Sequence, residues 1–272
     1  MYFGSTLPSI LRPITLRRTT SLPEFTISDE YYTVKVSRTP EEVEQALRLR
    51  FNVFNLEMGE GLESSFLTMK DEDPYDKQCD HLLIIENNTK EVIGTYRLQT
   101  LQMAERGIGF YSNSEFQLDM LGKKILKGAV ELGRACISKD FRNTRVLFLL
   151  WRGIAHYLAQ TGKRYMFGCC SLTSQDGGEG LALLRYLDSK GHVDHSYELL
   201  PQPGFELPHE GPVPDINVPM PPLMNIYFRY GACIVGQPAI DRDFKTIDYL
   251  VLFDLKTMGK ETYKLFLGTE NR

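Results

Sequence analysis

The chain has 272 residues, of which 42% are hydrophobic and 24% are charged, and its formal net charge is −4. This composition is sufficient for a sizeable core and is typical of a soluble enzyme. The negative charge argues against a general nucleic-acid binder, and no apolar run is long enough to cross a bilayer.

Two parts of unequal length are expected. Residues 1–30 are poorly patterned, with three arginines among isolated apolar residues, and this N-terminal extension either lies on an anionic membrane surface or is disordered. We favour disorder or loose docking. Residues 31–272 are expected to form a single domain.

The first half of this domain contains clear strand and helix signals. Residues 32–37 alternate as a strand does, and Thr39 followed by Pro40 starts a helix that we expect to end near Gly59. Residues 81–86 and 91–100 form a predicted hairpin. The next strand is expected over 128–138.

The second half begins with a helix that Thr144 can cap and that runs to Gly162. The further predicted elements are a strand over 164–171, helices over 179–190 and 222–230, a strand over 247–255 and a short final helix. Eight of the fourteen prolines fall between Pro201 and Pro222. This density indicates a long loop, which is either an inert linker or a lid.

The segment ELGRACI, residues 131–137, places a carboxylate and a guanidinium three positions apart inside an apolar strand. Residues i and i+3 of a regular strand face opposite sides, so Glu131 and Arg134 share a face only if the strand carries an extra residue. Gly133 is where such a bulge is expected. The alternative is a structural ion pair at a sheet edge.

Further charged residues accompany this pair and make a balanced set of three arginines and three acids. Its members are Arg50, Asp73, Asp76, Arg97, Glu131 and Arg134. Charges are withdrawn from water at tolerable cost only when they are paired, so a balanced set suits a partly buried polar cleft.

The motif order RxxVF, DxxD, YRL and ELGR resembles that of the acyl-homoserine-lactone autoinducer synthases. The chain is more similar still to the ornithine-lipid synthases, which are ornithine–acyl-carrier-protein N-acyltransferases of the GNAT superfamily, often labelled hemolysin-like. The similarity extends from about Tyr32 to Phe266. It implies an α/β fold, with a GNAT-like mixed β-sheet between two helical layers and a C-terminal elaboration.

The resemblance also implies a reaction, the transfer of a (3-hydroxy)fatty acyl group to the α-amine of ornithine, giving lyso-ornithine lipid. Glu131 is then the candidate general base and Arg134 its catalytic neighbour, because an amino-acid amine must lose a proton before it attacks. Arg97 and Arg134 would hold negative charge, and Asp73 and Asp76 a cationic amine, while Arg50 orders the two aspartates.

The acyl donor is expected to be acyl-carrier protein. Enzymes of this superfamily that use acetyl-CoA cradle its pyrophosphate in a glycine-rich turn, whereas residues 139–146 here read KDFRNTRV, without glycine. Residues 123–164 carry ten basic side chains and two acids, a local net charge of +8 that suits an acidic partner. We therefore assign Arg142, Asn143 and Arg145 to the carrier protein and its phosphopantetheine.

No bound cofactor and no metal site are predicted. His192 and His195 near Asp194 fall short of a zinc ligand set, and the five cysteines, without a CxxC motif, suit free thiols in a reducing cytosol. No secretory signal is recognised at the N-terminus. We expect a cytoplasmic protein at the inner surface of the membrane, because its product is amphiphilic.

Three alternatives remain at this point. In the first, the acceptor is another amino acid or a homoserine-type signal precursor. In the second, Cys136 is a nucleophile in a two-step transfer. In the third, the chain is a non-enzymatic, hemolysin-like membrane-active protein.

Overall fold

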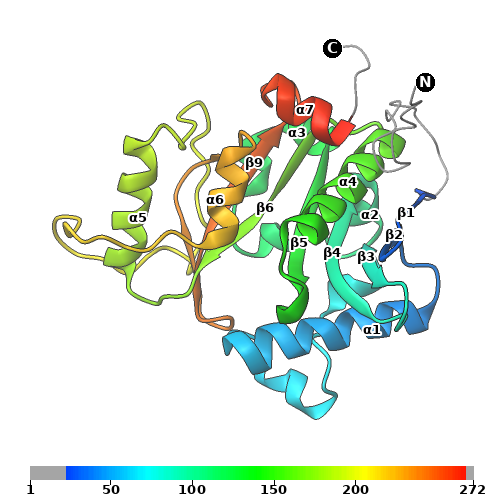
Figure 1. Ribbon diagram of the computed structural model, residues 1–272. Helices are drawn as coiled ribbons and strands as arrows, with labels where there is room; N and C mark the ends of the chain where they lie inside the picture. The colour runs from blue at the N-terminus through cyan, green and yellow to red at the C-terminus, as the bar shows by residue number, and fades with distance from the viewer. Residues whose placement is uncertain (1–22, 268–272) are drawn as a thin grey trace.

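A computed structural model describes residues 23–267 and shows a mixed β-sheet with helices on both faces (Figure 1). The sheet order is β1-β2-β3-β4-β5-β6-β9-β7, and β8 also pairs with β9. All neighbouring strands are antiparallel except β5 and β6. The strands are β1 (Thr26–Ser28), β2 (Tyr32–Val36), β3 (Asp80–Glu86), β4 (Val92–Thr100), β5 (Ala129–Ile137), β6 (Tyr165–Leu172), β7 (Cys233–Ile234), β8 (Ala239–Asp241) and β9 (Thr246–Asp254).

The helices are α1 (Pro40–Arg50), α2 (Leu101–Arg106), α3 (Lys123–Lys127), α4 (Thr144–Thr161), α5 (Gly177–Ser189), α6 (Pro222–Arg229) and α7 (Lys260–Leu267). A π-helix, η2 (Phe51–Met58), continues α1. The 3₁₀ helices are η3 (Glu63–Leu67), η4 (Pro74–Lys77), η5 (Tyr111–Ser114), η6 (Leu118–Leu121) and η7 (Lys139–Phe141).

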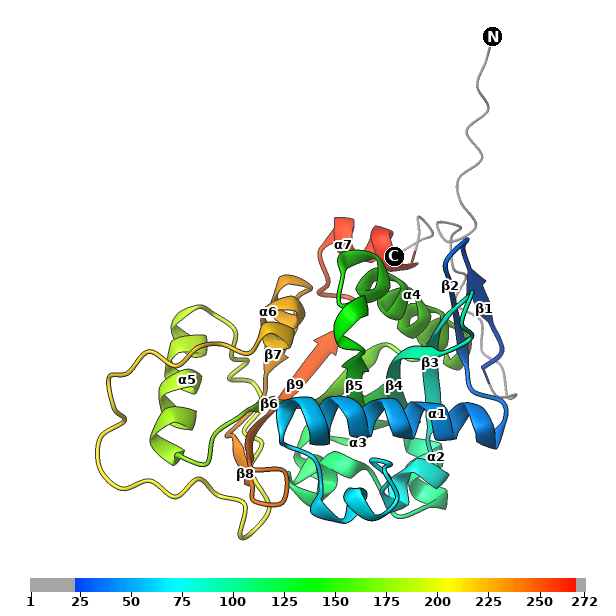
Figure 2. The ribbon, with the colours of Figure 1, turned by 60° about the horizontal axis from the view of Figure 1, so that its bottom comes forward.

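The helices form two layers because successive residues of a strand face opposite sides of the sheet. Leu82 belongs to the core cluster that contains residues of α4, whereas Leu83 belongs to the cluster that contains residues of α1. Figure 2 shows these two helices on different sides of the sheet. Helices α2 and α3 lie on the same face as α1, where they contribute to a cluster with Phe167 and Leu252. The predicted three-layer α/β/α architecture is confirmed.

Most predicted elements are present, with differences at their ends. Thr39 caps α1 by accepting a hydrogen bond from the backbone N–H of Glu42, and Gly59, at φ +72°, ends η2. The predicted helix thus has the expected length, although its second half is a π-helix. Asn143, and not Thr144, caps α4, because its carboxamide oxygen accepts from the backbone N–H of Val146 at 3.0 Å.

Three short strands, β1, β7 and β8, are not predicted from the sequence. Strand β1 falls inside the predicted extension over residues 1–30, and it was overlooked because its three residues form a strand only by pairing with β2. Residues 1–22 lie outside the described part of the chain. The short strands β7 and β8 likewise exist only as partners of β9.

Strands β5 and β6 separate at the centre of the sheet. Their parallel pairing covers only Ala129 to Glu131 on β5, although both strands continue well beyond it (Figure 1). A cavity of about 1240 Å³ opens beside them, lined by residues that follow the last pair on each strand. The divergence of two strands thus creates room for a ligand beside the middle of the sheet.

The proline-rich loop forms part of this cavity wall. Residues 216–219, together with Pro221 and Pro222, line the cavity and lead into α6, which contributes Tyr227. Of the two interpretations offered by the sequence, an inert linker and a lid, the structure favours a covering segment.

Candidate active site

Strand β5 carries the extra residue that the sequence predicts. Thr95 pairs with Cys136 and Arg97 pairs with Gly133, so a step of two residues on β4 matches three residues on β5. The strained position is Arg134, at φ +49°, and not Gly133. Because of this bulge, Glu131 and Arg134 both line the cavity.

The guanidinium of Arg50 is fully buried between two carboxylates. It donates to both oxygens of Asp76, at 2.6 and 3.2 Å, and to Asp71 at 3.0 Å. Burial works to raise the pKa of each of the two aspartates, but the neighbouring arginines outweigh it and lower both pKa values. Arg50 therefore holds Asp76, one of the two aspartates that it is predicted to order, while its second partner is Asp71, which the sequence does not indicate, in place of Asp73.

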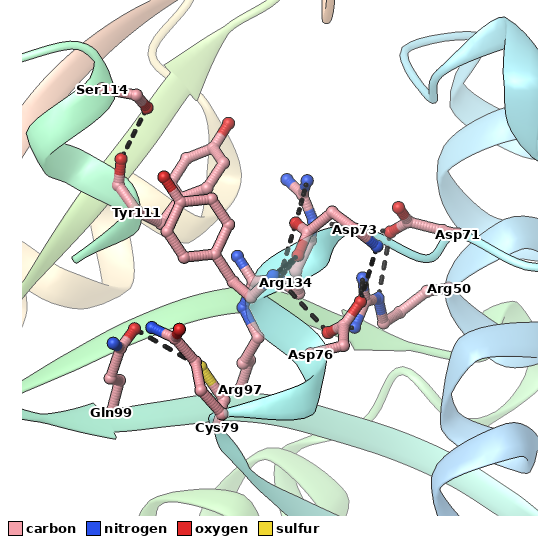
Figure 3. Close-up of polar contacts among 12 residues, drawn as sticks. Arg50, Asp71, Asp73, Asp76, Cys79, Arg97, Gln99, Tyr111, Ser114 and Arg134 are labelled. Carbon is pink, nitrogen blue, oxygen red and sulfur yellow. Dashed lines mark hydrogen bonds and ion pairs between the residues drawn. The ribbon is translucent and has the colours of Figure 1, made fainter. Parts of the chain in front are cut away.

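Two further arginines reach Asp73 from neighbouring strands. Arg97 on β4 donates to both oxygens of Asp73, at 2.7 and 2.6 Å, and Arg134 on β5 donates to one of them at 3.0 Å (Figure 3). The predicted balance of three arginines and three acids exists in the structure, but Asp71 takes the place of Glu131 in it.

This network also bears on the predicted substrate-binding set. Every side-chain oxygen of Asp73 and Asp76 already accepts a hydrogen bond from an arginine or a backbone N–H. Neither aspartate lines the cavity, nor does Arg50, whereas Arg97 does. The contacts of Arg50, Asp73 and Asp76 are thus with one another and with neighbouring arginines, and their role in substrate binding stays a prediction.

Glu131 stands apart from the arginine network. Its two oxygens accept hydrogen bonds from the backbone N–H groups of Tyr111, at 3.0 Å, and Ser112, at 2.7 Å, at the start of η5. Burial raises the pKa of this carboxyl despite these hydrogen bonds. A carboxylate that is held by backbone and has an elevated pKa is suited to accept a proton.

Tyr111 is a residue of the site that sequence reasoning missed. Its ring lies under both cavity arginines, 5.4 Å from the guanidinium carbon of Arg97 and 5.0 Å from that of Arg134. The ring of Phe244 stacks on Arg134 from elsewhere in the chain, at 4.3 Å. Aromatic rings at these distances stabilise desolvated guanidinium groups, and no motif marks them in the sequence.

A second acidic cluster was also missed. Glu115, Cys169 and Asp248 each offer a ligand atom, and these atoms lie within 4.8 Å of one another. Burial raises the pKa of Asp248 to about 6 and, with the nearby charge of Asp248, raises the pKa of Glu115 well above its usual value. The three residues of this cluster are 54 to 133 positions apart along the chain, so no sequence pattern connects them.

The predicted carrier-protein residues lie at the start of α4. Arg142 and Asn143 line the cavity, and Arg145 does not. Arg142 forms a two-pronged ion pair with Glu57, at 2.5 and 2.7 Å, and Arg145 pairs with Asp29 at 2.8 Å.

The basic segment around them does not form one continuous surface. Arg152 is buried, Lys163 donates to the backbone carbonyl of Lys127, and Arg164 pairs with Asp254. Part of the local charge of +8 is compensated by acids elsewhere in the chain, because Glu57, Asp29 and Asp254 pair with arginines of this segment.

The two histidines considered as metal ligands have other contacts. His195 Nε2 lies 2.7 Å from a carboxylate oxygen of Asp188, and the ring of His192 stacks on Phe228 with centroids 4.2 Å apart.

Comparison with known proteins agrees with this architecture. Residues 49–152 match the acetyltransferase (GNAT) domain family, which identifies the mixed sheet as a GNAT fold and the protein as an acyltransferase. Among solved structures, the AHL synthase LasI has a TM-score of 0.49 and 14% identity over 92% of this chain and 100% of that chain.

The L-ornithine Nα-acyltransferase of Rhizobium meliloti (strain 1021) is 30% identical over 234 residues, covering 81% of this chain and 79% of the relative. The L-ornithine Nα-acyltransferase of Agrobacterium fabrum (strain C58) is 30% identical over 253 residues, covering 88% of this chain and 86% of the relative. The chain belongs to the L-ornithine Nα-acyltransferase family.

Proposed function

We propose that this protein transfers a (3-hydroxy)fatty acyl group from acyl-carrier protein to the α-amine of L-ornithine, giving lyso-ornithine lipid. The observation that carries the proposal is the position of Glu131, a buried carboxylate on the wall of a large cavity where β5 and β6 separate. The family relatives that act on ornithine support the choice of acceptor.

The chemistry follows from the groups on the cavity wall. The amine nitrogen attacks the thioester carbonyl, the C–N bond forms, the C–S bond breaks, and the thiol of phosphopantetheine leaves. Glu131 takes the proton that the amine loses, directly or through water, and returns it to the departing sulfur. General-base help of this kind contributes roughly 10²–10⁴ in rate.

The two cavity arginines are proposed to hold negative charge. Arg97 and Arg134 are fixed by Asp73 and by the ring of Tyr111, so they approach the cavity in a preorganised orientation. The carboxylate of the acceptor amino acid is the anion that such a pair suits, because guanidinium groups bind carboxylates with defined geometry.

The cavity itself suits a long acyl chain. Its volume exceeds the roughly 300–1000 Å³ that is usual for small-molecule sites. Its apolar wall comes from Leu147 and Leu150 of α4, Ile226 of α6, and the covering segment of the proline-rich loop.

The donor is proposed to be acyl-carrier protein. Arg142 and Asn143 lie at the N-terminus of α4 on the cavity wall, and a helix N-terminus suits the single phosphate of phosphopantetheine. The absence of glycine from residues 139–146 supports this donor over CoA.

A position at the inner surface of the cytoplasmic membrane is part of the proposal, because the product is amphiphilic. Within residues 23–267, no helix has the length and apolar character of a membrane span. Association is therefore proposed to be peripheral.

The test is an assay with purified protein, 3-hydroxyacyl-carrier protein or the matching acyl-CoA, and each amino acid in turn, with products read by mass spectrometry. We expect Nα-acylornithine from the carrier-protein donor. Acylation of other amino acids in preference to ornithine would contradict the acceptor, and a faster reaction with acyl-CoA at equal concentration would contradict the donor.

A further inference from the structure

A second acidic region lies beside the cavity that contains Glu131, and one of its two carboxylates, that of Asp248, lines this cavity. Glu115, just after η5, is 1% exposed, and Asp248 on β9 is 4% exposed. Within the described residues, no lysine or arginine forms an ion pair with either of them. This contrasts with the aspartates of the Arg50 network, each of which has an arginine partner.

Three buried oxygen atoms of this region have no hydrogen-bond partner among residues 23–267. They are Glu115 Oε1, Asp248 Oδ1 and the hydroxyl oxygen of Thr246. Thr246 is 2% exposed, and it lines the cavity together with Asp248 and Cys169. Buried polar atoms without partners are costly, so their position beside a cavity indicates a ligand that supplies donors.

The sheet register places these groups on the same face as Glu131. Thr246 and Asp248 are two residues apart on β9 and so share a face. A chain of contacts leads to Glu131: Cys169 Sγ lies 3.5 Å from both Glu115 Oε2 and the Ser112 hydroxyl, and the Ser112 backbone N–H donates to Glu131. The acidic region and Glu131 are therefore two ends of one polar wall.

We propose that Asp248 and the hydroxyl of Thr246, with Glu115 beside Asp248 as a positioning residue, bind the side-chain ammonium group of a dibasic acceptor amino acid while its α-amine is presented to Glu131. This inference rests on the proposed function and deepens it, because it assigns to particular residues the distinction between dibasic and neutral acceptors. An ammonium group has three N–H donors, and two of the oxygen atoms that lack partners, Asp248 Oδ1 and the Thr246 hydroxyl, belong to residues that line the cavity.

The charge of the region agrees with one ammonium group. Asp248 titrates at a pKa of about 6, and burial together with the Asp248 charge keeps the pKa of Glu115 well above its usual value. Asp248 therefore carries a negative charge at neutral pH, which an ammonium group neutralises.

The arrangement also gives a reason for acylation at the α-amine. An ammonium held between carboxylates keeps its proton and has no free electron pair, so the side-chain nitrogen is not nucleophilic. The α-amine, beside Glu131, is the nitrogen that loses a proton. Removing the acidic pair should therefore change the site of acylation as well as affinity.

The experiment compares ornithine with norvaline, which has the same carbon chain without the side-chain amine. Glu115→Gln and Asp248→Asn keep the shape of each side chain, and Glu198→Gln, at an exposed glutamate, is the matched control. We expect the acid variants to raise KM for ornithine roughly tenfold to a hundredfold, to leave kcat/KM for norvaline unchanged, and to form some Nδ-acyl product. The control should match the wild type.

Several outcomes would overturn the inference. Equal losses with ornithine and norvaline would make the pair structural, and stoichiometric zinc in purified wild type that is absent from the variants would make it a metal site. If a variant fails to fold, as judged by circular dichroism, Thr246→Val is tested in its place. This variant should raise KM for ornithine and leave KM for norvaline unchanged. No change in either KM, or an equal rise in both, would contradict the proposal.

Failure of the proposed function is recognised separately. If wild-type protein acylates no ornithine with any donor, that function is wrong, and calorimetric titration then tests the acidic region alone. Ornithine should bind the wild type more tightly than norvaline does, and the preference should vanish in Asp248→Asn. Equal binding of the two amino acids by the wild type would refute the ammonium site.

Discussion

The backbone N–H of Ser112 donates a 2.7 Å hydrogen bond to Glu131. It joins the start of η5 to the middle of β5, and with the N–H of Tyr111 it fixes the carboxylate from two sides. The candidate base is thus held by backbone atoms, which leaves the arginines of the site free to pair with the aspartate loop.

Replacing Glu131 by glutamine should abolish most turnover, with a loss of roughly 10²–10⁴ in kcat, because the amide cannot accept the proton of the amine. Since burial raises the pKa of Glu131, wild-type activity should fall as the pH decreases through that raised value. The residual activity of the variant should lack this dependence. Circular dichroism checks folding, and unchanged turnover in a folded variant would exclude Glu131 as the base.

Changing Cys136 to serine should leave the protein active. The thiol is buried in a cluster with Ala46 and Leu49, and burial raises its pKa to about 12, so it remains protonated and weakly nucleophilic at neutral pH. Intact-protein mass spectrometry after incubation with the acyl donor should show no adduct at this residue. An adduct in the wild type that disappears together with activity in the variant would favour the two-step thiol mechanism.

The variant Asp76→Asn should destabilise the fold by about 3–5 kcal/mol, since it leaves the guanidinium of Arg50 buried with part of its charge uncompensated. Asp215→Asn, which removes an exposed partner of Arg185, is the control and should cost at most about 1 kcal/mol. Urea denaturation measures both.

The two buried aspartates that pair with Arg50, Asp71 and Asp76, make the free energy of unfolding depend on pH. The pKa values of Asp71 and Asp76 are lowered in the folded state. Their contribution is therefore fully present above the unfolded pKa of about 3.9 and is lost as the pH falls toward the folded values. Asp76→Asn should be less sensitive to acid than the wild type, and an identical slope for the two proteins would contradict this assignment.

Reversing charge at both Arg142 and Arg145 should raise KM for acyl-carrier protein much more than KM for a short pantetheine thioester. Electrostatic attraction guides a large acidic partner over a Debye length of about 10 Å at 0.1 M salt, whereas a small neutral donor feels little of it. Arg185→Glu, at an exposed arginine away from α4, is the control.

Ionic strength gives an independent check of the same docking proposal. Wild-type activity on the carrier protein should fall as salt rises, while activity on the short thioester stays nearly constant. If both donors respond equally to the two substitutions, these arginines serve the fold, through Glu57 and Asp29, and not the carrier protein.

Cell fractionation tests the peripheral position at the membrane. We expect the protein in the membrane fraction at low salt and its release at high salt, because the proposed association is peripheral. A protein that stays with membranes at high salt, but is freed by deletion of residues 1–25, would show instead that the N-terminal segment is an apolar anchor.

The sequence by itself determined the local elements and the charged residues that were singled out. Thr39 and Pro40 start a helix and Gly59 ends it, because capping and left-handed conformations depend on the residue type at one position. The extra residue near Gly133 was predictable as well, since a carboxylate and a guanidinium three positions apart need a bulge to share a face.

Only the tertiary structure decided which charges are paired and which remain free. Asp71 completes the arginine network, Glu131 is held by backbone N–H groups, and Glu115 meets Asp248 across a wide separation in the chain. Such contacts depend on the register of β4, β5, β6 and β9 and on the path of the loops between them. Ion pairing and burial act through space, and the order of residues along the chain does not encode their distances.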